Sequence, residues 1–439
     1  MTAHAPKPSR RKPPAPAQVR IDRVGSEGDG IARLPDGTPL YLPFTLPGET
    51  VGARPLQSRG DGWHAFAETI AGATDSRVEP PCRHFGRCGG CVLQHWRDAD
   101  YRAWKAGLVS HALRQAGFAP PDPLPFIPGL PGERRRMDFA VRRTAGRIVL
   151  GLHEQRSVEV IDIADCLVLH PALMILFPPL RVLLQNLQAI RREGSVVINL
   201  LDSGPDMLLR TDAKLTLEDR IALTNFARDR GLPRVSQAQG SGVPETIGLL
   251  RPPVTAMSGV SIRPPPGVFL QATAEAERAI IDAVLQGLPT KITGKTRVAE
   301  LYAGCGTLTF ALAKAVRVAA YEGDLATVTA LKQAINQGGA TGRIEAFQRD
   351  LARQPLSAKE FAAFAGVVLD PPHGGAAAQI GQIAAALVPT VVYVSCNPAT
   401  LSRDARMLHG AGYRLTAATA IDQFLWSARA ESVSVFRRG

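Results

Sequence analysis

The sequence lacks the patterns that would place this protein in or beyond a membrane. A membrane-spanning helix needs about 20 consecutive apolar residues. The most apolar long stretch, residues 167–187, instead contains His170, Arg181, Gln185 and three prolines. The first residues also lack the apolar segment of a secretory signal. We therefore expect a cytoplasmic protein without a membrane segment, and we expect it to be a monomer.

Cysteine is scarce, and its spacing is unlike that of small secreted proteins held together by disulfides. Six cysteines occur in 439 residues at uneven intervals, unlike the dense disulfide framework of a small secreted domain. In a chain of this length such cysteines favour metal binding or catalysis in a reducing compartment. The sequence also lacks a Gly-Lys-Ser/Thr after its glycine turn at 304–306, which disfavours a phosphate-binding P-loop.

The length of the chain indicates the number of domains, and its charge indicates the class of partner. A chain of 439 residues is too long for one ordinary core, so two or three domains are expected. The formal net charge is +12, which fits a polyanionic partner, with nucleic acid first. Residues 1–17 are rich in proline and contain basic residues but no acid. They indicate a basic tail, which either contacts phosphates or is only solvated.

Residues 18–72 have the pattern of a small β-barrel. Short alternating runs from Val19 to about Ile70 are separated by turn signals such as Asp36-Gly37, which is typical of short strands at regular spacing. The string Gly28-Asp29-Gly30-Ile31-Ala32-Arg33, followed by Leu46-Pro47-Gly48-Glu49, resembles a TRAM domain. That resemblance implies an OB-like barrel that binds RNA.

Residues 73–265 indicate a mixed α+β central domain, which ends at the proline-rich stretch 263–267. Beyond it, in 266–439, apolar runs alternate with helical segments. This alternation predicts a doubly wound parallel sheet. The last two runs leave no room for a helix between them, so they should pair antiparallel. The runs are 297–302, 316–321, 344–347, 366–370, 390–395, 413–419 and 432–436.

Ligands of such sheets bind at the carboxyl ends of the strands. After the first run, Gly304 and Gly306 permit a tight turn, and acids end the next three runs at Glu322, Asp350 and Asp370. A glycine turn followed by this series fits an adenosine-containing ligand. S-adenosylmethionine fits better than NAD, because Thr309 leaves the G-x-G-x-x-G pattern incomplete. Each acid taken singly could instead cap a helix.

Cys396 ends another strand, in Ser395-Cys396-Asn397-Pro398. A cysteine at a strand end can act as a nucleophile, although a buried core cysteine is the commonest alternative. A second group of cysteines has the spacing Cys-x5-Cys-x2-Cys, with a fourth much later in the chain. Four thiolates can hold a metal, and spacing alone leaves zinc and a [4Fe–4S] cluster open. These four are Cys82, Cys88, Cys91 and Cys166.

Together these motifs resemble the RNA (uracil-5-)-methyltransferases of the bacterial TRAM and iron–sulfur type. The resemblance runs from about residue 18 to the end. It includes Phe269-x-Gln271, Asp370-Pro371-Pro372, the Cys396 segment and a terminal Glu431-Ser432-Val433. It implies a class I S-adenosylmethionine-dependent methyltransferase domain, Rossmann-like in fold. It also implies that the four clustered cysteines hold a [4Fe–4S] cluster.

The same resemblance implies a role for each site residue. Cys396 would be the nucleophile that adds to C6 of uracil, and Glu431 the base that removes the C5 proton. Without Cys396 in view, Glu431 would be taken for an exposed acid on a final strand. The residues that would bind the cofactor are Gln271, Tyr302, Thr307, Glu322, Asp350 and Asp370.

The expected substrate is a uridine in structured RNA, with 23S ribosomal RNA favoured over the T-loop of tRNA. A non-catalytic RNA-binding or ribosome-assembly factor is the alternative from another class. Two positions, His373 and Arg429, differ from the residues common in the family, arginine and histidine. A run of arginines at 134–136, with Arg142 and Arg143, matches a segment that faces RNA in the family, or else is a solvated charge run.

Overall fold

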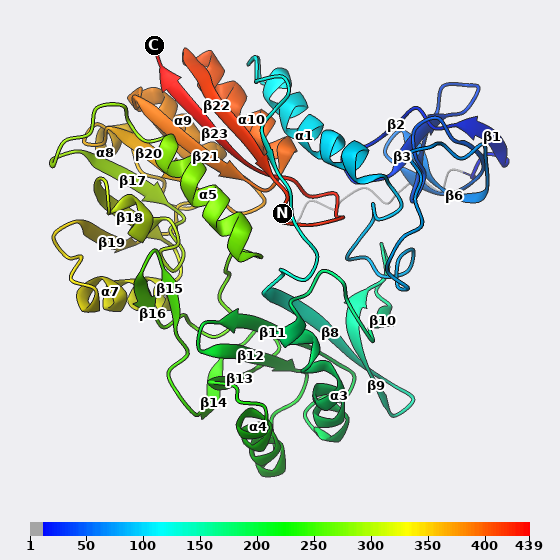
Figure 1. The fold of residues 1–439 in the computed structure, drawn as a ribbon, viewed down its shortest axis with the longest axis horizontal. Coiled ribbons are helices and arrows are strands. Elements are labelled where there is room, and N and C mark those ends of the chain that lie inside the picture. The colour runs from blue at the N-terminus through cyan, green and yellow to red at the C-terminus, as the bar shows by residue number, and fades with distance from the viewer. Residues whose placement is uncertain (1–11) are drawn as a thin grey trace, which may run out of the picture. The chain divides into compact units, whose positions relative to one another are not determined.

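The computed structural model describes residues 12–439, and these divide into two compact units (Figure 1). One unit holds the residues up to Ala103 together with Trp426–Ala428. The other holds Trp104–Leu425 and Arg429–Gly439. Most of the predicted basic tail, residues 1–11, lies outside the described residues. In residues 12–439, no helix is both long enough and apolar enough to cross a membrane.

Six strands of the first unit form one sheet, in the order β1-β5-β6-β4-β3-β2. Buried and exposed residues alternate along them, and buried side chains such as Leu40, Val51 and Trp63 make a shared apolar core. Gly28 and Gly37 lie between strands with φ of 84° and 85°, a conformation that glycine adopts most readily. The strands are β1 Ala17–Arg20, β2 Arg23–Val24, β3 Gly30–Arg33, β4 Pro39–Leu42, β5 Thr50–Arg59 and β6 Gly62–Ala71.

The second unit contains a seven-stranded sheet in the order β10-β9-β8-β11-β12-β13-β14. Its strands are β8 Arg136–Thr144, β9 Arg147–His153, β10 Val160–Asp162, β11 Glu193–Leu201, β12 Gly204–Thr211, β13 Arg234–Gln239 and β14 Glu245–Leu249. Its helices are α2 Pro171–Met174, α3 Phe177–Asn186 and α4 Leu217–Asp229. Phe139 of β8 packs edge-on against Phe177 of α3, with ring centroids 4.7 Å apart. Helix α3 therefore covers the face that Phe139 occupies.

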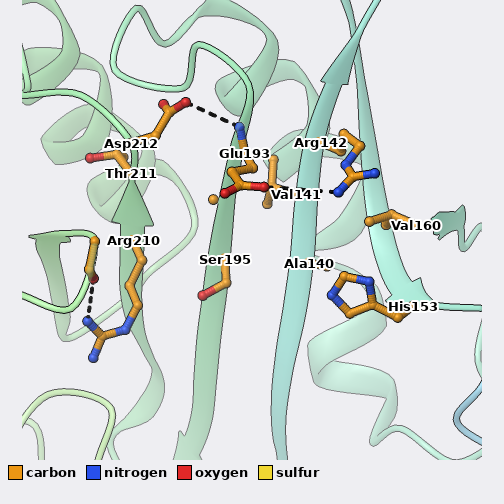
Figure 2. Close-up of a pocket in the computed structure, with 12 residues that line it drawn as sticks. Ala140, Val141, Arg142, His153, Val160, Glu193, Ser195, Arg210, Thr211 and Asp212 are labelled. Carbon is orange, nitrogen blue, oxygen red and sulfur yellow. Dashed lines mark hydrogen bonds and ion pairs between the residues drawn. The ribbon is translucent and has the colours of Figure 1, made fainter. Parts of the chain in front are cut away.

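The opposite face of this sheet bears a cavity of about 350 Å³ (Figure 2). Ser195 and Arg210 pair across the sheet in register and line the cavity, with Arg142 on its other side. The Nη1 atom of Arg210 donates a hydrogen bond to the carbonyl of Gly240 at 2.8 Å, and Arg142 lies 4.0 Å from the carboxylate of Glu193. Charges of both signs therefore meet in this cavity.

An eight-stranded sheet has the order β19-β18-β17-β20-β21-β23-β22-β7. The strands from β19 to β21 are parallel, and β23 pairs antiparallel with both β21 and β22. The predicted parallel sheet and the predicted antiparallel pairing of the last two runs are thus both confirmed. The strands are β7 Phe126–Ile127, β17 Arg297–Leu301, β18 Arg317–Glu322, β19 Ile344–Gln348, β20 Gly366–Leu369, β21 Thr390–Ser395, β22 Tyr413–Ile421 and β23 Glu431–Arg438.

Helices cover both faces of this sheet. In β20, Val367 belongs to an apolar cluster with residues of α1, α9 and α10, whereas its neighbour Val368 belongs to one with residues of α5 and α7. A strand buried on both faces reads as a continuous apolar run, as Gly366–Leu369 does. The helices are α1 Asp98–Gln115, α5 Ala274–Gln286, α6 Thr309–Leu312, α7 Leu325–Gln337, α8 Ala358–Phe361, α9 Ala377–Ala386 and α10 Pro398–Gly410. A hairpin of β15 Thr255–Met257 and β16 Val260–Ile262 precedes α5.

One part of the eight-stranded sheet comes from an earlier stretch of the chain. Strand β7 pairs parallel with β22, Phe126 opposite Ala420, and Val109 and Leu113 of α1 belong to the same apolar cluster as Phe436 of β23. Residues of the predicted central segment therefore complete the C-terminal sheet. Local periodicity cannot reveal this, because it specifies an apolar face but not its partner.

A buried ion pair in the seven-stranded sheet also binds the proline-rich segment 263–267 that follows the sheet in the chain. Arg234 of β13 binds Asp206 of β12 through two hydrogen bonds of 2.8 and 2.7 Å, and donates another to the carbonyl of Pro264. Their side chains are 9% and 1% exposed. Burial raises the pKa of Asp206, and only the guanidinium of Arg234 opposes that rise. Removing Arg234 would leave a buried carboxylate without its cation.

We expect Arg234→Leu to lower the free energy of unfolding by about 3–5 kcal/mol, because it leaves Asp206 unpaired in the interior. Urea unfolding followed by circular dichroism measures this loss. Arg220→Leu is the matched control, since Arg220 and Glu245 form an exposed pair on the same domain, 41% and 57% exposed. It should cost at most about 1 kcal/mol. Equal losses in the two variants would contradict the role given to the buried pair.

Candidate active site

The predicted catalytic and cofactor-binding residues converge on one edge of the eight-stranded sheet. Because β17 to β21 are parallel, their carboxyl ends lie at the same edge. Five of the residues predicted from sequence end these strands or follow them within two positions: Tyr302, Glu322, Asp350, Asp370 and Cys396. The structure therefore places them together. Glu431 reaches this edge from β23, Gln271 from the segment before α5 and Thr307 from the turn between β17 and α6.

The turn after β17 depends on left-handed backbone. Gly304 and Gly306 have φ of 54° and 99°, and a Cβ on Gly306 would lie 2.7 Å from the ring of Phe310. Only glycine fits there. Tyr302 also has a positive φ, 64°, although it carries a side chain. Such strain costs of order 1–3 kcal/mol and gathers at functional sites.

Glu322 is held against this turn by backbone amides. Gly304 donates a hydrogen bond of 2.9 Å to its Oε2 atom, and Asp324 donates one of 2.9 Å to Oε1. Each carboxylate oxygen accepts more than one hydrogen bond, so both can still receive hydroxyl donors from a ligand. Thr307 lies on the following segment and makes a 3.8 Å contact from its hydroxyl to the sulfur of Met257.

Gln271 and Asp370 form a buried polar pair. The Nε2 atom of Gln271 donates a 3.0 Å hydrogen bond to Oδ2 of Asp370, and Gln271 is 5% exposed. Its Oε1 atom is buried and accepts no hydrogen bond from residues 12–439. A buried acceptor without a donor costs about 1–3 kcal/mol. This pair is therefore prepared to receive a donor group from a ligand.

Glu300, inside β17, is a further acid that the sequence patterns did not single out. It is 2% exposed, and burial raises its pKa to about 8, with the charges of Asp370 and Glu322 adding to the rise. Its position inside an apolar run is the sequence feature that could have marked it, since charged residues are seldom buried. Glu300 adds a third carboxyl group beneath the glycine turn.

Cys396 and Glu431 lie near each other because of the pairing of β21 with β23. Ser395 ends β21 and is paired with Ser432 in this antiparallel ladder. Cys396, which follows β21, and Glu431, the first residue of β23, therefore lie at the same end of the ladder. Burial, followed by the charges of Glu431 and Asp370, raises the pKa of the Cys396 thiol to about 11, although Arg429 acts to lower it. The thiol is thus protonated near neutral pH.

Cys305, within the glycine turn, provides the contrast. It is 2% exposed and packs in an apolar cluster, and burial raises its pKa to about 12. Cys396 is only half-buried. Of the two cysteines at this edge, Cys305 therefore has the features of a core residue and Cys396 those of a group that a ligand can reach.

The carboxyl group of Glu431 is buried and only partly satisfied. Its Oε2 atom accepts a 2.9 Å hydrogen bond from Gln423, while Oε1 is buried and has no hydrogen-bond partner among residues 12–439. Burial, followed by the charge of Asp370, raises the pKa of Glu431 well above its ordinary value. Gln423 in turn accepts a 2.8 Å hydrogen bond from the amide of Ala272. It lies on the loop before β23, where no sequence pattern marks it.

The loop that carries Cys396 is fixed from both sides. Asn397 caps α10 by accepting from the amide of Ala399, and its Nδ2 atom donates to the carbonyl of His373 at 3.0 Å. Asp404 is fully buried in α10 and accepts 2.7 Å hydrogen bonds from the hydroxyl of Tyr393 and the amide of Ala376. These bonds join the helix to β21 and to the segment after Asp370.

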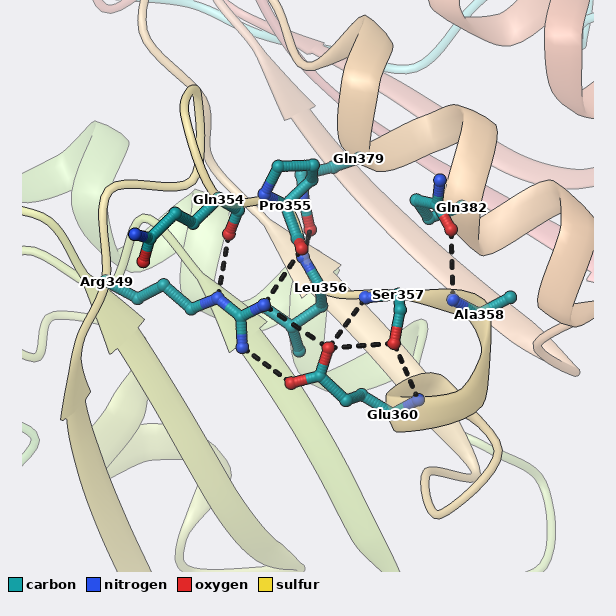
Figure 3. Close-up of polar contacts among 9 residues, drawn as sticks. All are labelled: Arg349, Gln354, Pro355, Leu356, Ser357, Ala358, Glu360, Gln379 and Gln382. Atoms are coloured by element: carbon teal, nitrogen blue, oxygen red, sulfur yellow. Dashed lines mark hydrogen bonds and ion pairs between the residues drawn. The ribbon is translucent and has the colours of Figure 1, made fainter.

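Asp350 makes mainly local contacts. It is exposed, and its Oδ1 atom accepts hydrogen bonds from the amides of Ala352 and Arg353, which caps the turn after β19. The neighbouring Arg349 binds Glu360 and the carbonyls of Gln354 and Pro355, as Figure 3 shows. This network ties the segment carrying Asp350 to α8.

The four clustered cysteines lie on two segments. Cys82, Cys88 and Cys91 are on the connection between β6 and α1, and Cys166 follows β10; all four are half-buried and none forms a disulfide. The amide of Gly90 donates a 3.4 Å hydrogen bond to the sulfur of Cys88. Within residues 12–439, no three His, Cys, Asp or Glu side chains are arranged as ligands of a metal ion. The [4Fe–4S] cluster therefore stays a prediction.

The predicted RNA-facing arginines are engaged within the protein. Arg135 binds Glu277 at 2.6 Å and the carbonyl of Gln271 at 3.2 Å. Arg143 donates to carbonyls at the end of α3, including Leu184 and Leu187, and Arg136 lies 5.3 Å from the ring centre of Phe269. These arginines hold segments together, whether or not they also meet a nucleic acid.

Comparisons with known proteins agree with this arrangement. The sequence profile of tRNA (uracil-5-)-methyltransferases matches residues 260–438, and that of the TRAM domain matches residues 17–54. A protein of Rhizobium meliloti named as an RNA methyltransferase is 39% identical over 427 residues, which cover 96% of this chain and 99% of that protein. The 23S rRNA (uracil(1939)-C(5))-methyltransferase RlmD of Pseudomonas entomophila is 34% identical, covering 96% of this chain and 94% of its own length.

A solved structure confirms the predicted fold class. The Pyrococcus abyssi tRNA (uracil-54, C5)-methyltransferase, in complex with S-adenosyl-L-homocysteine, matches 95% of this chain and 99% of its own with a TM-score of 0.70. At 19% identity this likeness establishes the fold only. The family is established by the sequence relatives. The chain therefore belongs to the RNA (uracil-5-)-methyltransferase family, whose members are S-adenosylmethionine-dependent enzymes, and it carries an N-terminal TRAM domain.

Proposed function

We propose that this protein methylates C5 of a uridine in 23S ribosomal RNA, with Cys396 as the nucleophile and Glu431 as the base. The observation that carries the proposal is that both residues lie at the same end of the β21–β23 ladder, where the charge of Glu431 acts on the thiol of Cys396. It is supported by the relative named as a 23S rRNA methyltransferase, which aligns over nearly the whole chain. Such a substrate is met in the cytoplasm, where we place the protein.

The cofactor site is proposed to consist of the residues around the glycine turn. The orphaned Oε1 atom of Gln271 and the remaining lone pairs of Glu322 suit the amino and hydroxyl groups of S-adenosylmethionine. Tyr302 and Asp370 border the same turn, with Thr307 and Asp350 beside them. When bound, the cofactor supplies an electrophilic methyl group on a sulfonium sulfur.

Cys396 makes C5 of the uracil reactive. Its sulfur adds to C6 while the thiol proton passes to water, and the electron pair of the C5–C6 double bond forms an enolate. C5 of this enolate would take the methyl group, with S-adenosylhomocysteine as the leaving group. Because the pKa of the thiol is about 11, Cys396 must lose its thiol proton when the uracil binds. Arg429 favours the thiolate, since its positive charge lowers that pKa.

Glu431 completes the reaction. After methyl transfer, C5 still carries its proton, and a base must remove it so that the electrons return to the C5–C6 bond and the sulfur of Cys396 leaves. The raised pKa of Glu431 makes its carboxylate a stronger base than an exposed glutamate. The unpartnered Oε1 atom is the atom available to accept the proton, while Gln423 holds Oε2.

The T-loop uridine of tRNA is the second candidate substrate, because the matching family profile is described as tRNA (uracil-5-)-methyltransferase. The target base must leave its stack in either RNA, because Cys396 has to reach C6 and Glu431 the proton on C5. Mapping 5-methyluridine in RNA from a deletion strain distinguishes 23S rRNA from tRNA as the substrate. Loss of one site in 23S rRNA supports the proposal, and loss in tRNA overturns the choice of substrate.

We also propose that Cys82, Cys88, Cys91 and Cys166 bind a [4Fe–4S] cluster. Thiolates are the ligands that such clusters require. The first three lie on a connection with no helix or strand between β6 and α1, and a bound cluster would order it. The methyl transfer itself moves no electron, so a cluster here would be structural.

Replacing Cys396 with Ala should abolish methyl transfer to unmodified ribosomal RNA, because C5 is then never activated. Incorporation of radiolabelled methyl groups measures this. Cys305→Ala is the matched control, since Cys305 packs in the core, and it should retain activity. Substantial activity in Cys396→Ala would refute the nucleophile assignment.

Glu431→Gln should instead trap the enzyme on its RNA. Loss of a general base slows proton removal by roughly 10²–10⁴-fold, so the covalent bond from Cys396 to C6 persists and gives a slow band on a denaturing gel. The double variant with Cys396→Ala should show no such band. Wild-type turnover by Glu431→Gln, without an adduct, would mean that another group is the base.

Protein purified without oxygen should be brown and contain about four irons and four sulfides per chain, as a [4Fe–4S] cluster requires. Cys88→Ser should lose the colour, whereas Cys305→Ser should keep it. Colourless wild-type protein with stoichiometric zinc would show that the cysteines hold zinc instead.

A further inference from the structure

The amino edge of the eight-stranded sheet contains a cavity of about 390 Å³, a size typical of ligand pockets. Its walls come from the loops that precede β17, β18 and β19. These strands are parallel, so the cavity lies at the opposite edge from Cys396. At about 3.3 Å per residue, strands of five or six residues separate the two edges by roughly 16–20 Å.

The charged side chains that line this cavity are all cations: Lys314, Arg317 and Arg343. Lys314 and Arg317 make no ion pair or side-chain hydrogen bond with any residue of 12–439, and both are exposed. Cations this close repel one another, and an anion between them relieves that repulsion. The cavity over the seven-stranded sheet differs, because there Arg142 and Arg210 already meet a carboxylate and a carbonyl.

Arg343 is positioned rather than loose. Its Nη1 atom donates to the carbonyls of Ala313 and Lys314 at 3.1 and 3.4 Å, and within residues 12–439 its Nη2 and Nε atoms bind no acceptor. The adjoining smaller cavity, of about 150 Å³, shares Arg317 and Arg343 and contains an acid, Glu345. Arg297 pairs with that acid at 3.0 Å, which leaves the other cations uncompensated.

We infer that this cationic pocket, formed by Lys314, Arg317 and Arg343, binds backbone phosphates of the RNA substrate outside the loop that holds the target uridine. The inference takes the identity of the polyanion from the proposed function. Guanidinium and ammonium groups are the usual partners of phosphate oxygens, and such contacts give affinity without sequence preference. The pocket would thus increase affinity for long RNA and leave the chemistry unchanged.

Binding of a long fluorescein-labelled RNA duplex, followed by anisotropy at several salt concentrations, tests the inference without any methyl transfer. Lys314→Ala/Arg317→Ala should weaken binding roughly tenfold at low salt and reduce the slope of log K against log salt by about 2, one unit for each lost phosphate contact. Lys332→Ala/Lys359→Ala removes two exposed lysines of α7 and α8 and should match wild type. Equal behaviour of the two double variants would overturn the inference.

Two further measurements test whether the variant is folded and whether the pocket binds a small phosphate compound instead of RNA. Retained binding of S-adenosylhomocysteine by Lys314→Ala/Arg317→Ala shows that the domain is folded, so that any lost affinity belongs to the pocket. Calorimetry with pyrophosphate tests for a small ligand: if the variant loses pyrophosphate binding while RNA binding stays at the wild-type level, the pocket takes free phosphate compounds and the RNA assignment is wrong. A wild-type protein that methylates no RNA would refute the proposed function, but the binding comparison would still decide this inference.

Discussion

The antiparallel pairing of β21 with β23 is the constraint on which the candidate active site depends. It sets Ser395 against Ser432, and so brings residues 35 positions apart in sequence, Cys396 and Glu431, to the same end of one ladder. A slip of one residue in either strand would turn the side chains of that strand to the other face of the sheet and separate the two residues. Both strands are buried along most of their length, and the packing of their side chains on both faces of the sheet holds this register.

Much of this arrangement follows from the sequence, because strand ends and glycine turns leave local signals. The parallel sheet, its glycine turn and the acids at Glu322 and Asp370 were predicted from runs and spacing, and the structure places them at one edge. Gln423 and Glu300 were not predicted. Gln423 matters through a contact with Ala272, 151 residues away, and nothing local encodes such a contact. Likewise, residues 73–265 were predicted only as a mixed α+β domain, and nothing local indicated that Val109 and Leu113 of α1 pack on the C-terminal sheet.

The charges of the chain show why composition alone cannot locate a binding surface. The arginine run at 134–136 is the densest basic cluster of the central region, yet Arg135 is tied to Glu277 and Arg136 lies over Phe269. The uncompensated cations, Lys314 and Arg317, are three residues apart in the sequence, and Arg343 joins them because β18 and β19 begin at the same edge. Ion pairing, rather than the number of basic residues, determines which cations remain available to a polyanion.

The position of β23 also has a consequence for biosynthesis. Among the strands it is last in chain order, yet it lies between β21 and β22. While the chain emerges from the ribosome, β22 can pair only with β7, and the edge of β21 beside Cys396 stays open until residues 431–438 arrive. An open edge strand is a template for wrong pairing, and domains fold as their segments are synthesised. The nascent protein thus carries Cys396, the proposed nucleophile, on an unprotected edge until the strand that supplies Glu431 covers it.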